Sequence, residues 1–103
     1  MSSFLLSKAA QKDFKSIGSY TQRQWGHAQR LLSLTELNEC FITVAENPNI
    51  GTDCHYIEPG LKKHPYKSHI IFYEIQDNQN ILVIRILHKN MDVKSNLQTC
   101  IPE

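Results

Sequence analysis

Two apolar segments separated by five polar residues constrain this chain more than any other feature. The first covers residues 69–75 and the second residues 81–88, and the polar residues 76–80 between them are typical of a hairpin loop. The second segment carries Arg85 near its middle, and an unpaired charge buried in a strand costs several kcal/mol. We therefore predict two adjacent antiparallel strands, with Arg85 either on a partly open face or beside a dedicated partner.

Length and composition indicate one globular domain. The chain has 103 residues, of which 41% are apolar and 20% charged, and a domain of this size can be stable without metal or disulfide bonds. We expect residues 1–103 to form a single domain, with a flexible tail from about residue 93. No apolar stretch is long enough for a membrane span, and residues 1–6 are too short and uncharged for a signal peptide. A cytoplasmic protein without a membrane partner is expected.

Charge and cysteine content exclude several function classes. The formal net charge of +1 does not indicate a nucleic-acid binder, because such domains usually carry a dense basic stripe. The charge is slightly uneven, with the second half more basic than the first. Cys40, Cys54 and Cys100 are an odd number at wide spacings, which favours reduced thiols without a chemical role.

The first half of the chain predicts a short strand and two helices. Residues 3–6 are strand-like, and Ser7 can cap a following helix. Trp25-Gly26 interrupts the helical pattern, which resumes until Asn47-Pro48 ends it. Two helices with so short a break should form an antiparallel hairpin. The apolar positions that define the two helices are Ala10, Phe14, Ile17 and Tyr20, then Leu31, Leu34, Leu37, Phe41 and Val44.

Residues 52–66 give weaker signals. Residues 54–57 are a plausible strand, and Pro59-Gly60 is typical of a type II turn. Residues 61–66 are basic and lack an apolar period, which indicates an irregular segment. Val93, Leu97 and Ile101 are spaced four apart, as in a short helix or a docked arm.

A symmetric hairpin predicts which side chains share a face of the sheet. Tyr73 would then face Val83, and Ile71 would face Arg85. We expect the helices to cover the purely apolar face and the other face to be the working one, although a slip of one residue would exchange the faces of one strand. His88 would fall on the helix side unless a bulge turned it toward Arg85. The helix-covered face would hold Ile70, Phe72, Leu82, Ile84 and Ile86, and the working face His69, Ile71, Tyr73, Val83, Arg85 and Leu87.

Motif searches leave two kinds of chemistry open. Cys54, His55, His64 and His69 match no compact metal-ligand spacing, and no nucleophile or phosphate-loop motif is present, so we expect neither a metal ion nor a cofactor. The remaining polar set is Arg85, His69, Tyr73, Lys62 and Lys63. Such a set could cleave RNA with a histidine as acid or base, or it could anchor a protein partner.

Six short motifs follow one another along nearly the whole chain. Each is weak alone, but their order and spacing are specific. They are Ala10-x-x-Asp13-Phe14-x-x-Ile17-x-x-Tyr20, Trp25-Gly26, Asn47-Pro48-x-x-Gly51, Pro59-Gly60-Leu61, His69-Ile-Ile-Phe-Tyr73 and Arg85-Ile-Leu-His88-x-x-Met91-Asp92. In these motifs the chain resembles the ParE branch of the RelE/ParE toxin superfamily.

The resemblance implies an α+β fold and a toxin function. The fold would have an N-terminal strand and an antiparallel helical hairpin packed on one face of a small antiparallel sheet. The function would be that of the toxin of a bacterial type II toxin–antitoxin pair, neutralised by a cognate antitoxin. ParE members are associated with inhibition of DNA gyrase, whereas RelE-like relatives cleave messenger RNA on the ribosome, and fold alone does not decide between them.

The resemblance also implies roles for individual residues. Arg85 corresponds to an arginine shared across the superfamily, and His69 and His88 correspond to histidines that recur in ParE-like chains. The residues expected to bind the target are Arg85, His88, Met91, Asp92, His69 and Tyr73. The residues expected to bind the antitoxin are Ile71, Val83 and Leu87, together with Phe14 and Ile17 in a groove beside the first helix.

Gyrase inhibition through protein contacts, without turnover, is the first hypothesis. Its rival is a ribosome-dependent endoribonuclease, in which Arg85 with Lys62 or Lys63 would neutralise phosphate charge and His88 or His69 would transfer the proton. The first is favoured because His69 stands where nucleases have an arginine and because no tyrosine follows residue 73. Glu58, where relatives often have arginine, and Lys62, in place of a second one, weaken any role for guanidinium groups at that edge. A non-toxic member that only binds its antitoxin stays open, and we expect no direct DNA binding without the antitoxin.

Overall fold

The computed structural model describes residues 3–76 and 80–89. It contains β1 (Phe4–Leu6), α1 (Lys8–Trp25), α2 (His27–Glu46), a short 3-10 helix η1 (Pro48–Ile50), β2 (Thr52–Asp53), β3 (Leu61–Tyr66), β4 (His69–Ile75) and β5 (Ile81–His88). The expected tail helix near Val93 and Ile101 lies outside the described residues. In the described part of the chain, no helix is long and apolar enough to cross a membrane.

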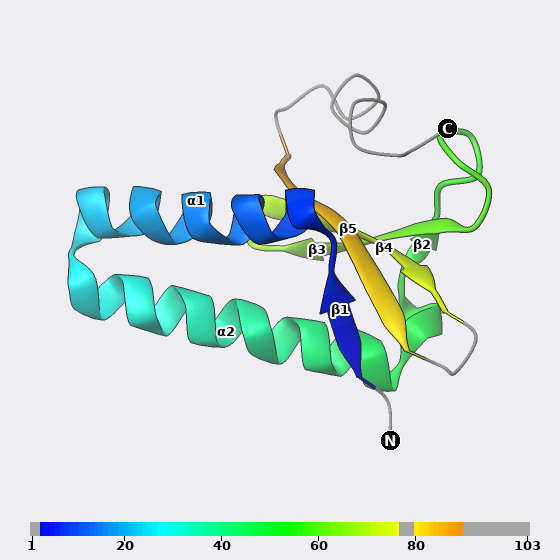
Figure 1. The fold of residues 1–103 in the computed structure, drawn as a ribbon, viewed down its shortest axis with the longest axis horizontal. Helices are drawn as coiled ribbons and strands as arrows, with labels where there is room; N and C mark the ends of the chain where they lie inside the picture. Colours follow the sequence, from blue (N-terminus) through cyan, green and yellow to red (C-terminus); the bar gives the residue numbers. More distant parts are fainter. Residues whose placement is uncertain (1–2, 77–79, 90–103) are drawn as a thin grey trace.

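The two helices form the expected antiparallel hairpin. Ser7 caps α1, since its Oγ accepts a hydrogen bond from the Ala10 backbone N–H at 3.0 Å. A single residue joins the helices, Gly26, whose φ of 96° is a conformation that favours glycine. The hairpin lies on one side of the sheet, and its distal half extends well beyond the sheet (Figure 1).

The sheet has the strand order β1-β5-β4-β3-β2. It is mixed rather than antiparallel throughout, because β1 runs parallel to β5. Two assignments from the sequence were wrong: residues 54–57 are a turn, and residues 61–66 form strand β3. Strand β3 was not predicted because its sequence, with Lys62, Lys63 and Pro65, shows no alternation of apolar residues.

A β-bulge in β5 changes the register of the central hairpin. Up to Tyr73 opposite Val83 the pairing is the predicted one, and beyond that point Ile84 is the extra residue. Arg85 therefore lies opposite Phe72 instead of Ile71, and His88 lies opposite His69. The bulge moves every later side chain of β5 to the other face relative to the prediction.

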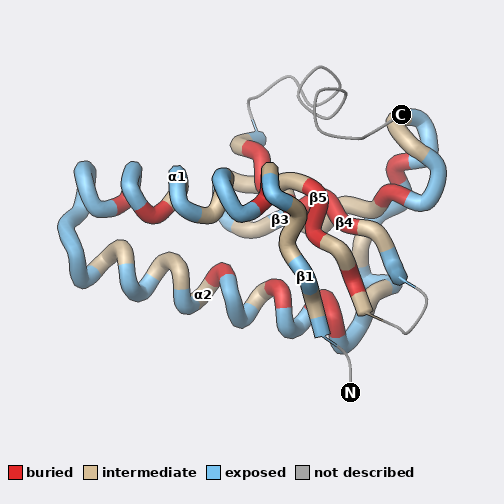
Figure 2. Tube along the Cα trace, viewed as in Figure 1, coloured by how far each residue is buried: buried red, intermediate tan, exposed pale blue. Residues whose placement is uncertain are grey.

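The helices cover the face that was predicted to be open. Ile71 and Val83 are fully buried between the helices and the sheet, whereas Phe72 and Ile84 belong to a second cluster on the far face. Figure 2 shows buried residues along the sheet and the proximal part of α2, and an exposed distal end of the hairpin. The helix-side core consists of Ala10, Leu37, Phe41, Val44, Ala45, Ile71, Tyr73, Ile81, Val83 and Ile86, and the far-side cluster of Cys54, Leu61, Phe72, Ile84 and Leu87.

Candidate functional site

Arg85 forms a bidentate ion pair with Asp13 of α1. The Arg85 Nε donates to Asp13 Oδ2 at 2.6 Å, and Nη2 donates to Oδ1 at 3.0 Å. Asp13 Oδ2 also accepts from the Ile86 backbone N–H at 3.0 Å. The two charged side chains are only 13% and 16% exposed, so this pair ties the helix to the edge of the sheet in a largely desolvated position.

The chain path explains why Asp13 reaches Arg85. Strand β1 covers the outer edge of β5 only from Ile81 to Val83. Beyond that point, side chains at the start of α1 bind the edge, since Ser7 Oγ donates to the Ile84 carbonyl at 2.7 Å and Asp13 receives the Ile86 N–H. Phe72, opposite Arg85, belongs to the far-side cluster. The side chain of Arg85 therefore leaves β5 on the face away from the helices, and its guanidinium turns at the strand edge to contact Asp13.

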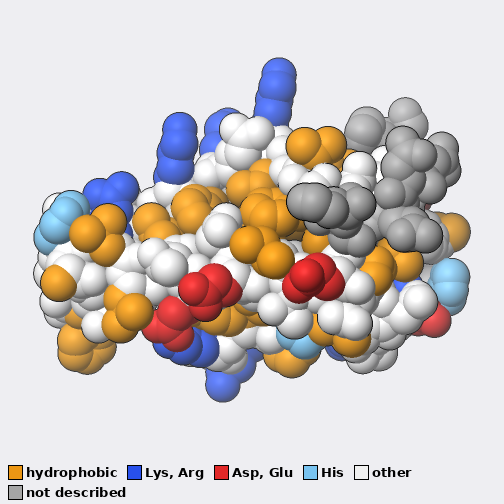
Figure 3. All heavy atoms as spheres, turned by 90° about the horizontal axis from the view of Figure 1, so that it is seen from below, with side chains coloured by type: hydrophobic (Ala, Val, Ile, Leu, Met, Phe, Trp, Pro, Cys, Tyr) orange, Lys and Arg blue, Asp and Glu red, His pale blue; other side chains and the backbone are white. Residues whose placement is uncertain are grey.

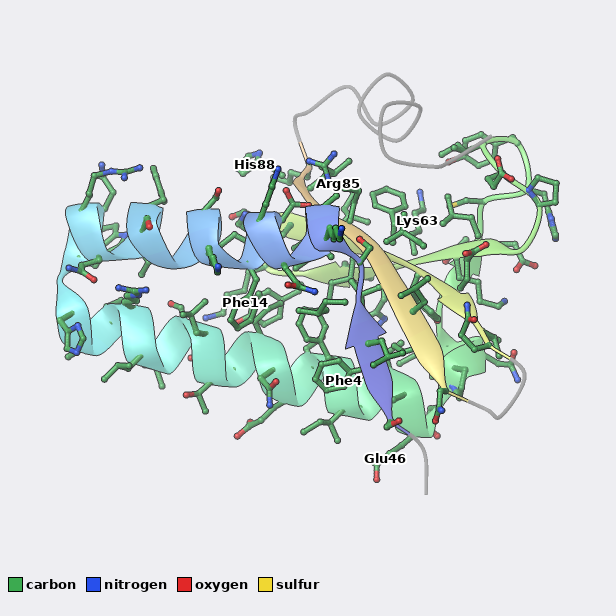
Figure 4. All side chains as sticks on the ribbon, viewed as in Figure 1. Phe4, Phe14, Glu46, Lys63, Arg85 and His88 are labelled. Atoms are coloured by element: carbon green, nitrogen blue, oxygen red, sulfur yellow. The ribbon has the colours of Figure 1, made fainter. Side chains whose placement is uncertain are left out.

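His69 and His88 face each other across β4 and β5 beside this pair. Their rings meet edge to face, with centroids 5.5 Å apart and an angle of 81°. Burial lowers the pKa of His69, the nearby His88 lowers it further, and Asp13 opposes the shift. Figure 4 shows Arg85 and His88 close together near the start of α1.

A groove of about 960 Å³ lies between the helical hairpin and the turn that joins β3 to β4. Its floor includes His69 and His88, and Lys67 at the turn has a φ of 52° and contacts Glu36 of α2 at 3.3 Å. The lining residues are Asp13, Ser16, Ile17, Tyr20, Thr21, Trp25, Gln29, Ser33, Tyr66, Lys67, Ser68, His69, Ile86 and His88. The groove thus combines apolar and aromatic walls with a few charged groups, as binding sites commonly do.

The distal half of the hairpin exposes large apolar side chains next to this groove. Tyr20 is 57% exposed, Trp25 73%, Leu31 54% and Leu32 52%. Single exposed apolar residues are common, but four occur within thirteen positions of this hairpin, and two of them, Tyr20 and Trp25, line the groove. This end of the molecule has the properties of a protein-binding surface.

Comparison with known proteins identifies the family. A family model described as "ParE toxin of type II toxin-antitoxin system, parDE" matches residues 4–93. The chain belongs to the ParE toxin family. It is 41% identical over 96 residues to Toxin ParE1 of Mycobacterium tuberculosis, covering 93% of this chain and 98% of that protein. It is 28% identical over 97 residues to Toxin ParE1 of Caulobacter vibrioides, covering 94% and 99%.

A solved structure supports the fold of this ParE family member. The structure described as "Chromosomal ParDE TA system from P. aeruginosa" matches with a TM-score of 0.72 and 17% identity, covering 85% of this chain and 96% of that chain. The predicted family and the α+β fold class are confirmed.

The structure corrects the expected orientation of several site residues of this ParE chain. Arg85 does not point into an open working face: its side chain leaves β5 on the face away from the helices, opposite Phe72, but its guanidinium turns at the strand edge to Asp13 of α1. Ile71 and Val83 are not exposed for an antitoxin, since they lie under the helices, and Leu87 is 1% exposed in the far-side cluster. The choice of the wrong face accounts for Ile71 and Val83. For Leu87 the bulge and that choice cancel, and this residue is buried because the far face has an apolar cluster of its own.

Tyr73 is a structural residue rather than an exposed contact for the target. It is 0% exposed, and its hydroxyl donates to the Pro48 carbonyl at 2.6 Å and accepts from the Gly51 N–H at 3.0 Å. Burial raises the pKa of this phenol. Tyr73 therefore anchors η1 beneath the sheet, and a side chain at Gly51 would overlap its hydroxyl.

The lysines proposed for phosphate binding have separate positions. Lys62 Nζ contacts Asp53 Oδ1 at 2.7 Å, and this hydrogen bond and charge lower the pKa of Asp53. Lys63 lies opposite Phe72, in the same cross-strand row as Arg85 (Figure 4). Within the described ranges no three His, Cys, Asp or Glu residues are arranged to hold a metal ion.

The other predicted contacts and one missed residue complete the site. Ile17 lines the groove, and Phe14 packs against Phe41 with ring centroids 6.2 Å apart. Met91 and Asp92 lie outside the described residues. Asp13 was not predicted as the partner of Arg85, although a carboxylate directly before the partly buried Phe14 indicates a charged group beside the core.

Proposed function

We propose that this ParE family member is a toxin that inhibits DNA gyrase by protein binding and that a cognate antitoxin neutralises it. Family membership supports the toxin class and an antitoxin partner. The geometry supports binding rather than catalysis for the reasons that follow.

Two cations of the candidate site, Arg85 and Lys62, are paired with carboxylates of the same chain, and this observation favours a binding protein over a nuclease. RNA cleavage needs cations that can stabilise phosphate charge in the transition state. Arg85 is held in two hydrogen bonds by Asp13, and Lys62 is in contact with Asp53. Of the three cations in the nuclease hypothesis, Arg85 and Lys62 would each have to leave a carboxylate before they could serve a substrate. Catalytic preorganisation is therefore poor, and a protein-binding toxin is favoured.

The antitoxin site that fits best is the groove together with the exposed end of the hairpin. Ile17 from the original antitoxin set lies in this groove, and Tyr20 and Trp25 line it while remaining largely exposed. An apolar groove of this kind suits an amphipathic helix or an extended segment of a partner. This surface replaces the patch of Ile71, Val83 and Leu87, which is buried within the chain itself.

Neutralisation then follows from overlap of the two binding surfaces. His69 and His88, both expected to contact the target, also line the groove. An antitoxin segment that fills the groove would cover these histidines and hinder gyrase from reaching the end of β5 around Arg85.

A reconstituted gyrase reaction tests the proposal. Purified toxin added to gyrase, ATP and relaxed plasmid should abolish supercoiling, and prior addition of the antitoxin encoded beside the gene should restore it. The matched variants are Trp25→Ala, which should weaken antitoxin binding at least tenfold, and Tyr56→Ala, an equally exposed aromatic residue outside the groove that should not. Normal supercoiling together with messenger cleavage in a translating extract would establish the nuclease instead, and no effect in either assay would indicate a non-toxic antitoxin-binding member.

A further inference from the structure

Helix α1 carries a stripe of positive charge on its outer face. Lys8, Lys12, Lys15 and Arg23 are all exposed, and at 3.6 residues per turn they fall within an arc of about 80° over a length of about 22 Å. The helix holds these four cations and one carboxylate, so its formal charge is +3, while the whole chain has +1 and the remainder therefore −2. Lys and Arg side chains project in a row from one edge of the surface in Figure 3.

The stripe is not used to stabilise the fold. The one carboxylate of α1, Asp13, turns to Arg85 and the Ile86 N–H, and none of the ion pairs among residues 3–76 and 80–89 involves a cation of the stripe. The first turn of α1 contains no acidic residue, and Lys8 is its first residue. A cation there is unfavourable because the amino end of a helix is already positive. A residue that lowers stability at its position and makes no compensating contact, as Lys8 does here, indicates a function.

The side chains between the cations identify the kind of partner. The same face exposes Gln11, Ser16, Ser19 and Gln22 and no apolar residue. Amides and hydroxyls join Lys and Arg in contacts to phosphate oxygens. Protein interfaces need apolar or aromatic anchors, and an interfacial membrane helix needs an exposed apolar face. The outer face has neither, because the exposed apolar residues of α1, Tyr20 and Trp25, line the groove instead. A phosphate backbone is the partner that this composition fits.

We propose that the outer face of α1 binds the phosphate backbone of duplex DNA. Binding of single strands relies on aromatic stacking, and this face has no aromatic residue, so a regular duplex is the better match. The net charge had indicated that the chain would not bind DNA without its antitoxin; that average conceals the stripe because α2 is acidic. The inference goes beyond the toxin function and concerns the isolated chain.

Fluorescence anisotropy with the full chain and a labelled 25-base-pair duplex tests the proposal. Four phosphate contacts should give a slope of log K against log salt of about −3.6, so affinity should fall by about 150-fold between 50 and 200 mM salt. Lys8→Gln with Lys15→Gln should halve that slope and weaken binding at 50 mM salt by more than about tenfold. Because the titration contains no gyrase, its result is independent of the supercoiling assay.

The matched control removes the same charge elsewhere. Lys67→Gln with Lys89→Gln also lowers the net charge by two and changes two exposed lysines outside α1, so it should keep the slope and stay within about twofold of the parent affinity. Circular dichroism melts verify that both variants are folded. Equal losses in the two variants, no binding at 50 mM salt, or equal or tighter binding of single-stranded RNA, duplex RNA or polyglutamate would each overturn the proposal.

Discussion

The two halves of β5 are held in different ways. From Ile81 to Val83 the strand lies between β1 and β4, and its side chains on the helix side are fully buried. From Ile84 to His88 the outer edge is bound by the side chains of Ser7, the N-cap of α1, and of Asp13 within α1, and this half carries Arg85 and His88. Both halves pair with β4, but a backbone ladder with β1 holds only the outer edge of the first half. The outer edge of the half that carries the candidate functional residues thus depends on a few polar side chains.

The largest effect is expected in the first half. Val83→Glu places a carboxylate in the helix-side core, where Val83 is 0% exposed, and should cost more than about 4 kcal/mol of the free energy of unfolding. Urea denaturation followed by circular dichroism measures this. Ile75→Glu is the control, because Ile75 is 41% exposed at the end of β4 and should lose less than about 1 kcal/mol. A folded Val83→Glu variant of parental stability would show that the helices do not cover this face.

The next effect should separate the two halves directly. Asp13→Ala leaves the Arg85 guanidinium and the Ile86 N–H without this acceptor, and should cost about 3 kcal/mol. Replacing the arginine as well, in Asp13→Ala with Arg85→Met, removes the charge that has lost its carboxylate and should recover at least half of that loss. A double-mutant cycle on the free energy of unfolding checks this. Additive losses would mean that the pair contributes little coupling.

The sequence anticipated the first half of β5 and missed the second for a physical reason. The pairing of Tyr73 with Val83 was predicted correctly, whereas the pairing of Arg85 was not. A bulge marked by glycine leaves a sequence signal, but here the extra residue is Ile84, inside a run of Ile, Leu and Val that suits either face. Because both faces of the sheet are covered, alternation carried no information about which face the helices occupy.

The candidate site was predictable as a set of residue types but not as an arrangement. Arg85, His69 and His88, all in the set expected to bind the target, lie near one another. The contact with Asp13 joins residues 72 positions apart, and no local pattern encodes so distant a pairing. The groove could not be predicted from the sequence either, since it depends on how far the hairpin extends past the sheet.

Ser7 lies at the junction of the two halves and should have an intermediate effect. Its Oγ accepts from the Ala10 N–H and donates to the carbonyl of Ile84, the extra residue of the bulge. Ser7→Ala removes both bonds and should cost about 1 kcal/mol. Thermal melts compare it with Ser19→Ala, an exposed helix position where the change should be neutral or slightly stabilising. Equal melting temperatures for the two variants would contradict a capping role.

The smallest effect is a pH dependence at the end of β5, where His69 of β4 lies opposite His88; the first half of β5, residues 81–83, contains no titratable group. Burial and His88 lower the pKa of His69 in the folded chain below its ordinary value of 6.5. As pH falls through that value, the unfolded chain takes up a proton that the folded chain resists, so stability should decline below about pH 6.5 and be constant above it. The slope from one proton is at most about 1.4 kcal/mol per pH unit. Urea midpoints at pH 7.5, 6.5 and 5.5 should show this decline in the parent and in His55→Gln, an exposed histidine, and a smaller one in His69→Gln. Identical declines in all three would mean that acid acts on groups other than the histidine pair, and the end of β5 would then be no more sensitive to acid than its beginning.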